Sequence, residues 1–448
     1  MYLIKNAHIV NENKIFSGDV LIKDGRIEKV AGEISNLPFA VEEINAEGKY
    51  LIPGMIDDQV HFREPGLTHK ATIYTEARAA VAGGVTSFME MPNTKPPAVT
   101  QVLLEDKYNI AANTSLANYS FFMGATNDNL DELKKTDASK VCGIKVFMGS
   151  STGNMLVDNN EALEKIYSEC NNLIAIHSES EEVINRNLSI YREKYGDNIP
   201  IECHPHIRSV EACYVSTQKA VALAKKYNTR LHILHISTEE ELELFDNTFP
   251  LAQKRITAEA CVHHLWFDAD DYKEYGGLIK CNPAIKEARH KKAILNGLLN
   301  DKIDILATDH APHTWEEKQG DYMHCPSGLP LVQHPLLMML DFYHDGKISL
   351  EKIVEKASHA PAVCFKIRER GYIREGYKAD LVLVDLNRKH TVSKENIYYK
   401  CGWSPLEGHT FNSSIDTIFV NGNKVFANGV FKEDVKGERL EFYSNQPS

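Results

Sequence analysis

The sequence lacks the features that mark several classes of protein. It has no run of basic residues and no basic-aromatic stripe, and its formal net charge is −12, so we expect no nucleic-acid partner. It has no segment of the roughly 18 consecutive apolar residues that a membrane span requires. Its first residues, "MYLIKNAHIVNENKIF", lack the apolar core of a signal peptide. We therefore expect a cytoplasmic protein without a membrane partner.

Cysteine is present but shows no pairing pattern. The chain has nine cysteines, and none of them lies in a C-x-x-C pair. In a chain of 448 residues, this pattern argues for reduced thiols and against a framework of disulfides. We expect the cysteines to behave as small core hydrophobes.

The two ends of the chain resemble each other and differ from the middle. Residues 1–50 and 372–430 contain short apolar segments separated by glycine turns, which predicts short β-strands. We therefore expect one composite β-sandwich, built from residues 1–50 and 372–448, around a larger domain that spans residues 51–371. A length of 448 residues suits a large barrel with an accessory domain.

The middle of the chain alternates between strand-like apolar runs and stretches with helical spacing, such as 68–84 and 209–228. This order predicts an α/β protein with a (β/α)8 TIM barrel. An open doubly wound sheet is the alternative, but "PGMIDDQVHF" after the first strand is not the glycine-rich phosphate turn that it needs. The eight predicted strands are 50–61, 85–91, 117–124, 141–148, 173–178, 231–237, 255–260 and 303–309.

Polar side chains gather where the predicted strands end, which is the face of such a barrel that carries function. Histidine and carboxylate ligands suit a divalent transition metal, Zn²⁺ most readily. A single histidine at a strand end is more often a hydrogen-bonded core or surface residue than a ligand, but convergence from five strands favours a metal site. The residues at these strand ends are Gln59, His61, Arg63, Asn93, Lys145, His177, His235 and Asp309.

Three of these residues have ordinary explanations as well as chemical ones. Lys145 could reach the barrel rim with its ammonium in water, Asp309 could cap a turn, and Arg63 could form a surface ion pair. Lys145, however, lies inside an apolar run, where a charged amine is costly. A neutral lysine amine can add CO₂ and become a carbamate, which serves as a bridging carboxylate.

Seven motifs together resemble the cyclic amidohydrolases, and among them the bacterial dihydroorotases. They are "PGMIDDQVHFREPG", "MPNT", "AIHSE", "HILHIST", "TAEACVHHL", "CNPAIK" and "ATDHAPH", and they occur in the order of that family along nearly the whole chain. The resemblance implies a barrel with a composite β-sandwich and one or two Zn²⁺ ions. The implied metal ligands are His61, carbamylated Lys145, His177, His235 and Asp309. The implied substrate contacts are His61, Arg63, Asn93, Asn282, His313 and the backbone near Ser327 and Gly328.

The resemblance also implies a reaction. It is the reversible cyclisation of N-carbamoyl-L-aspartate to L-dihydroorotate in pyrimidine (UMP) biosynthesis, by metal-activated hydroxide with Asp309 as general acid and base. Arg63 supplies a planar fork for the ring carboxylate of dihydroorotate, a group that hydantoin and allantoin do not offer in the same way. The expected partner is thus a small-molecule substrate, and a homodimer is the one assembly left open.

The chain departs from the family pattern at three positions. Gln59 stands in place of the first histidine of H-x-H, Lys286 stands where arginine is common, and Val262 replaces a usual proline. An amide oxygen is a poorer Zn²⁺ ligand than imidazole, so we expect weaker metal binding at His61 and Asp309 than at the other two histidines.

Two alternatives remain open at this point. One is a hydrolase of hydantoin or allantoin rings, and the other is a degenerate barrel that scaffolds a carbamoyltransferase. Gln59 favours the degenerate barrel slightly. Retention of every other ligand weighs against it.

Overall fold

Eight parallel strands form a closed barrel in the computed structural model, which describes residues 1–149 and 155–443. Strands β6 to β8 pair in one sheet, and β9 to β14 pair in a second. A β-bridge between Val60 at the end of β6 and His310 just after β14 closes the barrel on one side. On the other side, β9 (Met123–Gly124) follows β8 along the chain and pairs with β10 of the second sheet. The barrel strands are β6 (Met55–Val60), β7 (Val85–Glu90), β8 (Asn118–Phe121), β10 (Ile144–Phe147), β11 (Ile174–His177), β12 (Leu231–Ile233), β13 (Ile256–Cys261) and β14 (Ile305–Ala307).

Seven of the eight predicted runs contain one of these strands, and the run 255–260 covers all of β13 except Cys261, so the predicted barrel is confirmed. The predicted single strand 50–61 is wrong in one respect, because it consists of β5 (Tyr50–Pro53) and β6, which belong to different sheets. The division falls at Gly54, where a Cβ atom would lie 2.1 Å from the Thr86 hydroxyl oxygen. The absence of a side chain at Gly54 therefore lets the chain pass closely against β7 as it changes sheets.

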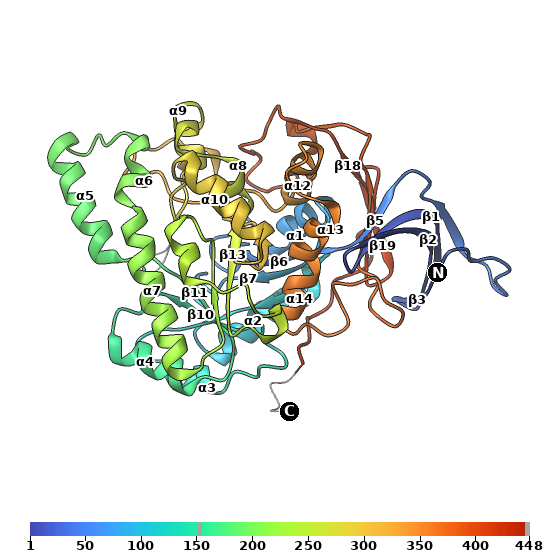
Figure 1. The fold of residues 1–448 in the computed structure, drawn as a ribbon, viewed down its shortest axis with the longest axis horizontal. Coiled ribbons are helices and arrows are strands. Elements are labelled where there is room, and N and C mark those ends of the chain that lie inside the picture. Colours follow the sequence, from blue (N-terminus) through green and yellow to red (C-terminus); the bar gives the residue numbers. More distant parts are fainter. Residues whose placement is uncertain (150–154, 444–448) are drawn as a thin grey trace.

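Helices cover the outside of the barrel (Figure 1). Helix α7 shows how the sequence sets their ends: the Ser209 side chain accepts the Ala212 N–H at its start, and Asn228 ends it with a left-handed φ of 55°. The main helices are α1 (Ile73–Ala82), α2 (Gln101–Thr114), α4 (Asn160–Glu169), α5 (Glu181–Tyr195), α7 (Val210–Tyr227), α10 (Ala288–Leu299) and α12 (Pro335–His344). Shorter helices include α3 (Leu130–Lys134), α6 (His204–Ile207), α8 (Val262–Trp266), α9 (Tyr272–Tyr275), α11 (Trp315–Lys318), α13 (Leu350–Val354) and α14 (Ala360–Cys364).

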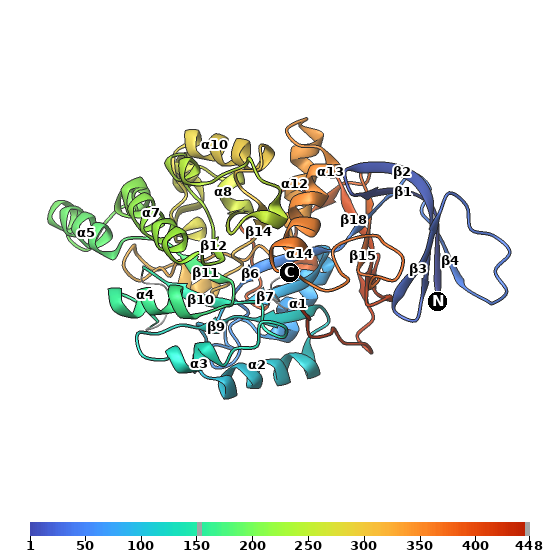
Figure 2. The same ribbon diagram turned by 60° about the horizontal axis from the view of Figure 1, so that its bottom comes forward.

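A nine-stranded sheet joins the two ends of the chain beside the barrel, as Figures 1 and 2 show in blue and red. Its order is β20-β19-β18-β15-β5-β1-β2-β3, with β4 paired to β1. The predicted composite β-domain from both ends is confirmed, since β5 pairs with β1 on one side and with β15 on the other. Its strands are β1 (Tyr2–Asn11), β2 (Lys14–Lys23), β3 (Arg26–Ala31), β4 (Glu42–Asn45), β5, β15 (Leu381–Asp385), β18 (Ser414–Val420), β19 (Asn423–Ala427) and β20 (Val430–Phe431).

Two further expectations are met by the described part of the chain. All nine cysteines are free thiols, and eight of them are buried. Within residues 1–149 and 155–443, no helix combines the length and the apolar character needed to cross a membrane.

Candidate active site

A cavity of about 250 Å³ lies at the carboxyl ends of the barrel strands. It brings together every residue of the predicted site except Asn93 and His313, and each of these two contacts a lining residue. Convergence of side chains from many strands at this face is expected for a barrel, because all parallel strands end there. The lining residues from the predicted site, with Gln59, are His61, Arg63, Lys145, His177, His235, Asn282, Asp309, Ser327 and Gly328.

The His61 ring points one nitrogen at Asn93 and the other at Asp309. Nδ1 lies 2.9 Å from Asn93 Oδ1, and an amide oxygen only accepts, so Nδ1 carries the ring hydrogen. Nε2 then presents a lone pair 3.1 Å from Asp309 Oδ1. Burial lowers the pKa of His61, which disfavours a second ring proton. Two electron-rich atoms facing each other at this distance form a suitable pair of donors for a cation.

His177 and His235 form a second pair of facing nitrogens. Nδ1 of His177 lies 2.9 Å from Nε2 of His235, while Nε2 of His177 lies 3.0 Å from Glu179. Burial of Glu179 would raise its pKa, but the charge of Arg208 and the hydrogen bond from His177 outweigh this effect and hold the pKa at about 2. The ionised carboxylate lies 3.0 Å from Nε2 of His177 and so favours the ring hydrogen on that nitrogen, which leaves the Nδ1 lone pair facing His235. Carboxylates orient metal-binding histidines in this way.

Lys145 has an environment that disfavours a charged amine. Its side chain is 1% exposed, and burial lowers its pKa to about 7 against the pull of Asp309 and Glu259. Its Nζ lies 4.7 Å from the centre of the Phe147 ring, and it has no hydrogen bond to any other described residue. A neutral amine in the cavity that also holds these two pairs of ligand atoms is the state that can add CO₂.

Arg63 lines the cavity, and one nitrogen of its guanidinium lacks an acceptor among the described residues. The Nζ of Lys70 lies 2.9 Å from Nδ1 of His313, and an ammonium only donates, so the hydrogen of His313 is on Nε2. That hydrogen is donated to the Ser327 carbonyl at 3.0 Å, so His313 Nε2 cannot also accept from Arg63 Nη2, 3.1 Å away. Arg63 Nε is fixed by the Pro312 carbonyl at 3.1 Å, while Nη2 has no other acceptor on the described chain.

Three site residues adopt a left-handed backbone conformation that residues other than glycine rarely take. The φ angles are 68° at Arg63, 40° at His235 and 46° at Asp309. Such conformations cost free energy and cluster at functional sites. His235 is held by its backbone N–H, which donates to Glu259 Oε1 at 2.9 Å. The chain thus tolerates strain where three predicted site residues enter the cavity.

Asn282 and Gly328 also line the cavity. The Asn282 Oδ1 atom is buried and has no hydrogen-bond donor, so it can accept from a ring N–H. A Cβ at Gly328 would lie 2.4 Å from the Ala311 carbonyl oxygen, so only glycine fits there. The Gly328 N–H donates to the Lys280 carbonyl and its own carbonyl accepts from Lys318 Nζ, each at 2.8 Å, so its two backbone polar groups are engaged within the protein.

Gln59 lines the cavity but faces a thiol. Its Oε1 lies 3.6 Å from Cys261 Sγ, which is a weak donor. The side chain is buried, with 2% exposed. The Gln59 carboxamide, which stands where the resembled family has a histidine, therefore lacks a strong hydrogen-bond partner.

Three contributors to the site were not predicted from the sequence. Arg208 lines the cavity and pairs with Glu179, and Lys70 fixes the His313 ring. Glu179 follows His177 by two residues in "AIHSE", and that spacing is the one available signal. Arg208 and Lys70 lie in connecting segments, where no periodicity marks them.

Two other groups of buried side chains could each hold a metal ion among the described residues. Within each group, the possible ligand atoms lie within 4.8 Å of one another. One is Asp58, His232 and Glu259 inside the barrel, where the Asp58 carboxylate lies 3.0 Å from His232 Nε2. Burial and the nearby Asp58 charge raise the pKa of Glu259 to about 8. Because Glu259 also accepts the His235 N–H, this group is joined to the site through the backbone of His235. The other is His263, His264 and Cys281.

Comparisons with known proteins show the family of the chain. The model of the Amidohydrolase family matches residues 50–425. A protein named dihydroorotase from Methanosphaera stadtmanae is 30% identical over 438 residues, which cover 97% of this chain and 98% of that protein. A dihydroorotase from Pyrococcus abyssi is 31% identical over 98% of both chains, and an allantoinase from Desulfitobacterium hafniense is 30% identical over 98% of both.

Solved structures give the same result for the fold. The L-hydantoinase (dihydropyrimidinase) from Arthrobacter aurescens matches with a TM-score of 0.93 and 26% identity, over 98% of this chain and 99% of that chain. The family model covers most of the chain, and the relatives span nearly all of it. The chain therefore belongs to the amidohydrolase family.

Proposed function

We propose that this protein is a dihydroorotase, a metal-dependent cyclic amide hydrolase that interconverts L-dihydroorotate and N-carbamoyl-L-aspartate. The observation that carries the proposal is the buried Arg63 guanidinium, whose Nη2 edge lacks an acceptor inside a cavity that also holds two facing pairs of metal-type ligands. A substrate of this site should bring a carboxylate, since a planar fork binds one through two parallel hydrogen bonds. The names of two relatives support the same substrate.

The residues present fit one or two divalent metal ions. His177 and His235 would hold one, His61 and Asp309 would hold the other, and Lys145 as a carbamate would add a carboxylate ligand. A metal ion at this place supplies a Lewis acid that lowers the pKa of water and polarises the ring carbonyl. Formation of the carbamate joins the Lys145 nitrogen to CO₂ and releases one proton from the amine, which the low pKa of this lysine favours.

The protein's own groups then perform the remaining steps. Arg63 binds the ring carboxylate and so fixes which face of the ring lies toward Asp309. Asn282 Oδ1 accepts a ring N–H. In the hydrolytic direction, the oxygen of water adds to the ring amide carbon, Asp309 takes the proton of that water, and the ring C–N bond breaks as Asp309 gives the proton to the leaving nitrogen. In the reverse direction, Asp309 takes the proton from the ureido nitrogen.

Arg208 is the second cation at the cavity, and it has a separate task. It pairs with Glu179, which is fully buried and orients His177. We infer that Arg208 keeps Glu179 ionised and so fixes the ring of His177. Arg63, rather than Arg208, is left to bind the substrate carboxylate.

The assay follows the loss of L-dihydroorotate by ultraviolet absorbance, with allantoin and hydantoin as parallel substrates. We expect turnover of L-dihydroorotate in both directions and slower turnover of the other two rings. The second candidate is an allantoin or hydantoin hydrolase, favoured by the similarity to the D. hafniense allantoinase and the A. aurescens L-hydantoinase. Faster turnover of either of those rings would establish the second candidate. No turnover of any ring by metal-loaded protein would favour a scaffolding barrel.

A further inference from the structure

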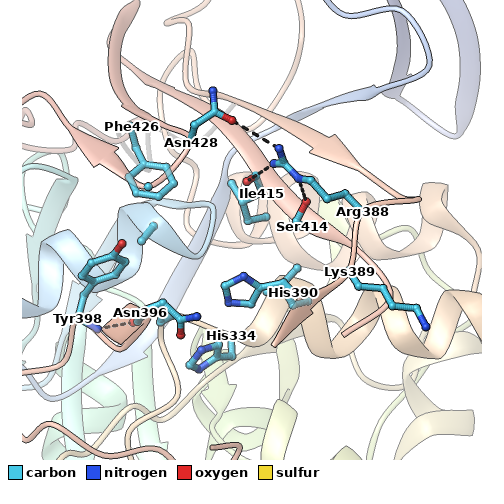
Figure 3. Close-up of a pocket in the computed structure, with 14 residues that line it drawn as sticks. His334, Arg388, Lys389, His390, Asn396, Tyr398, Ser414, Ile415, Phe426 and Asn428 are labelled. Carbon is cyan, nitrogen blue, oxygen red and sulfur yellow. Dashed lines mark hydrogen bonds between the residues drawn. The ribbon is translucent and has the colours of Figure 1, made fainter. Parts of the chain in front are cut away.

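Arg388, at a second cavity of the molecule, already has its hydrogen-bond partners. This cavity, of about 310 Å³, lies between the barrel and the composite sheet (Figure 3). The Arg388 guanidinium donates to the Ser414 hydroxyl at 2.6 Å, to the Ile415 carbonyl at 3.2 Å and to Asn428 Oδ1 at 3.4 Å. The guanidinium therefore needs no ligand, and the cavity selects none through it.

The buried group of Asp58, His232 and Glu259 also satisfies itself. Burial would lower the pKa of His232, but the neighbouring Cys364 and Asp58 hold it well above its usual value, so the ring carries a positive charge. The Asp58 carboxylate lies 3.0 Å from His232 Nε2. Opposite charges at this distance stabilise each other, and the group needs no metal ion.

The other buried group, which consists of His263, His264 and Cys281, differs because His264 has a lone pair without a partner. Its Nε2 lies 3.1 Å from the Pro283 carbonyl oxygen, which only accepts, so Nε2 carries the ring hydrogen. Burial and the neighbouring His263 lower the pKa of His264 well below its usual value, so the ring keeps this single hydrogen. Nδ1 is then a buried acceptor that no donor of the described residues reaches, which costs free energy.

The ring of His263 lies beside that of His264 and is in the same state. The two ring centroids are 4.2 Å apart. Burial lowers the pKa of His263 to about 4, against the charge of Asp309 and the Thr308 backbone, so the ring is neutral and one of its nitrogens has a lone pair. Neither nitrogen makes a hydrogen bond of normal geometry within the part of the chain that the structure describes.

Cys281 brings a thiol to the two rings. Its Sγ and one nitrogen of each histidine lie within 4.8 Å of one another, and the residue is 1% exposed. The thiol donates to the Pro283 carbonyl at 3.2 Å, which leaves the lone pairs of the sulfur free. Burial raises the pKa of this thiol well above its usual value, so it keeps its proton unless a metal ion displaces it.

Two imidazole nitrogens and one sulfur form a donor set that suits Zn²⁺. Three protein ligands are enough for such an ion when water takes the fourth position. A buried water molecule alone would also satisfy two lone pairs, but it would make no use of the thiol. The convergence of sulfur with two bare nitrogens therefore favours a metal ion over water.

We propose that His263, His264 and Cys281 bind one further metal ion of the Zn²⁺ class. The S–H bond of Cys281 breaks as the sulfur–metal bond forms, and the proton goes to solvent. None of the three residues lines the candidate active-site cavity, so this ion is additional to those of the proposed reaction. It is structural, because it fixes α8 to the segment that carries Asn282 into that cavity.

Protein produced with Co²⁺ in place of Zn²⁺ tests the proposal, because Co²⁺ bound to a thiolate has a sulfur-to-metal charge-transfer band in the near ultraviolet. The predicted ligands of the candidate active site offer nitrogen and oxygen, so the band reports a thiol. We expect the band in wild type and in His177→Ala, which removes one of those ligands. Cys281→Ser should lose both the band and one metal ion per chain.

Cys261→Ser is the matched control, since Cys261 is also a buried thiol and lies 3.6 Å from Gln59 Oε1; the band should persist in it. His264→Gln keeps a donor for the Pro283 carbonyl but not the ring lone pair. It should bind the ion at least about tenfold more weakly in competition with a chelator, which is the loss seen even for residues that only orient a ligand.

X-ray absorption at the zinc edge of wild-type protein keeps the test decisive if Cys281→Ser fails to fold, and it should show a Zn–S distance of about 2.3 Å. The proposal is overturned if wild type shows neither this distance nor the charge-transfer band, a result that would assign a buried water to the two histidines. A band that is lost in Cys261→Ser and kept in Cys281→Ser would also overturn it. All of these measurements are independent of turnover, so they do not depend on the proposed reaction.

Discussion

Asp309 has a left-handed backbone conformation, and its side chain lines the cavity. Its Oδ1 lies 3.1 Å from His61 Nε2. We predict that Asp309→Asn lowers kcat by at least about three orders of magnitude, because an amide neither takes nor gives a proton near neutral pH. Circular dichroism should show an unchanged fold. Activity within tenfold of wild type, in protein shown by mass spectrometry to be free of deamidation, would contradict the role of Asp309.

We predict that Lys145 makes activity at the site depend on CO₂ and on pH. Only the neutral amine adds CO₂, and the neutral fraction rises as pH increases through its pKa of about 7. We predict that protein stripped of metal and CO₂ regains metal and activity with bicarbonate, and that recovery is slow at pH 6 and faster at pH 8. Mass spectrometry under native conditions should show the added CO₂. Full recovery without bicarbonate at either pH would contradict the carbamate.

Gln59 leads to a prediction about how tightly the two metal ions bind relative to each other. Its Oε1 faces the Cys261 thiol, and an amide is a weaker Zn²⁺ ligand than imidazole. We predict that one Zn²⁺ binds tightly, that a second binds weakly with a rise in activity, and that Gln59→His lowers the concentration needed for the second. The measurement is a Zn²⁺ titration that follows both metal content and rate. Two equally tight ions in wild type, with no gain in Gln59→His, would show that Gln59 does not weaken the site.

At the scale of elements, the strand pattern of the barrel was predictable because eight apolar runs alternate with helical spacing. The residues at which the strands end were less predictable. The run 231–237 is a strand only over Leu231–Ile233, and 303–309 only over Ile305–Ala307. In both cases a site residue with positive φ, His235 or Asp309, lies just past the strand. Functional geometry overrides the local pattern at these places.

The close passage of the chain at Gly54 is the second feature that the pattern could not reveal, and it can be tested. A methyl group there would lie 2.1 Å from the Thr86 hydroxyl and would push β6 away from β7. We predict that Gly54→Ala lowers the apparent melting temperature by several degrees and reduces activity, because β6 leads to Gln59 and His61. Gly32→Ala is the matched control, since a Cβ there meets nothing within 4 Å. Equal melting temperatures for the two variants would contradict the account of β5 and β6.

At the scale of the whole molecule, the predicted ligands could be named from the sequence because parallel strands bring their carboxyl ends to one face. The residues that set their chemistry could not. Arg208 contacts Glu179, which in turn contacts His177, and Lys70 fixes the ring of His313. Both depend on how connecting segments fold back over the barrel, which has no periodic signature.

We propose above all that Arg63 binds the carboxylate of the substrate while the site hydrolyses the cyclic amide of the same molecule. The most direct test compares kcat/KM for L-dihydroorotate and for dihydrouracil, the same ring without the carboxylate, in wild type and in Arg63→Lys. Loss of one charged hydrogen bond costs about 1.5–3 kcal/mol. The account predicts that wild type prefers L-dihydroorotate, that Arg63→Lys loses about 10- to 150-fold on it with unchanged metal content, and that dihydrouracil changes less than about threefold. Equal losses on both rings, or a wild-type preference for dihydrouracil, would contradict it.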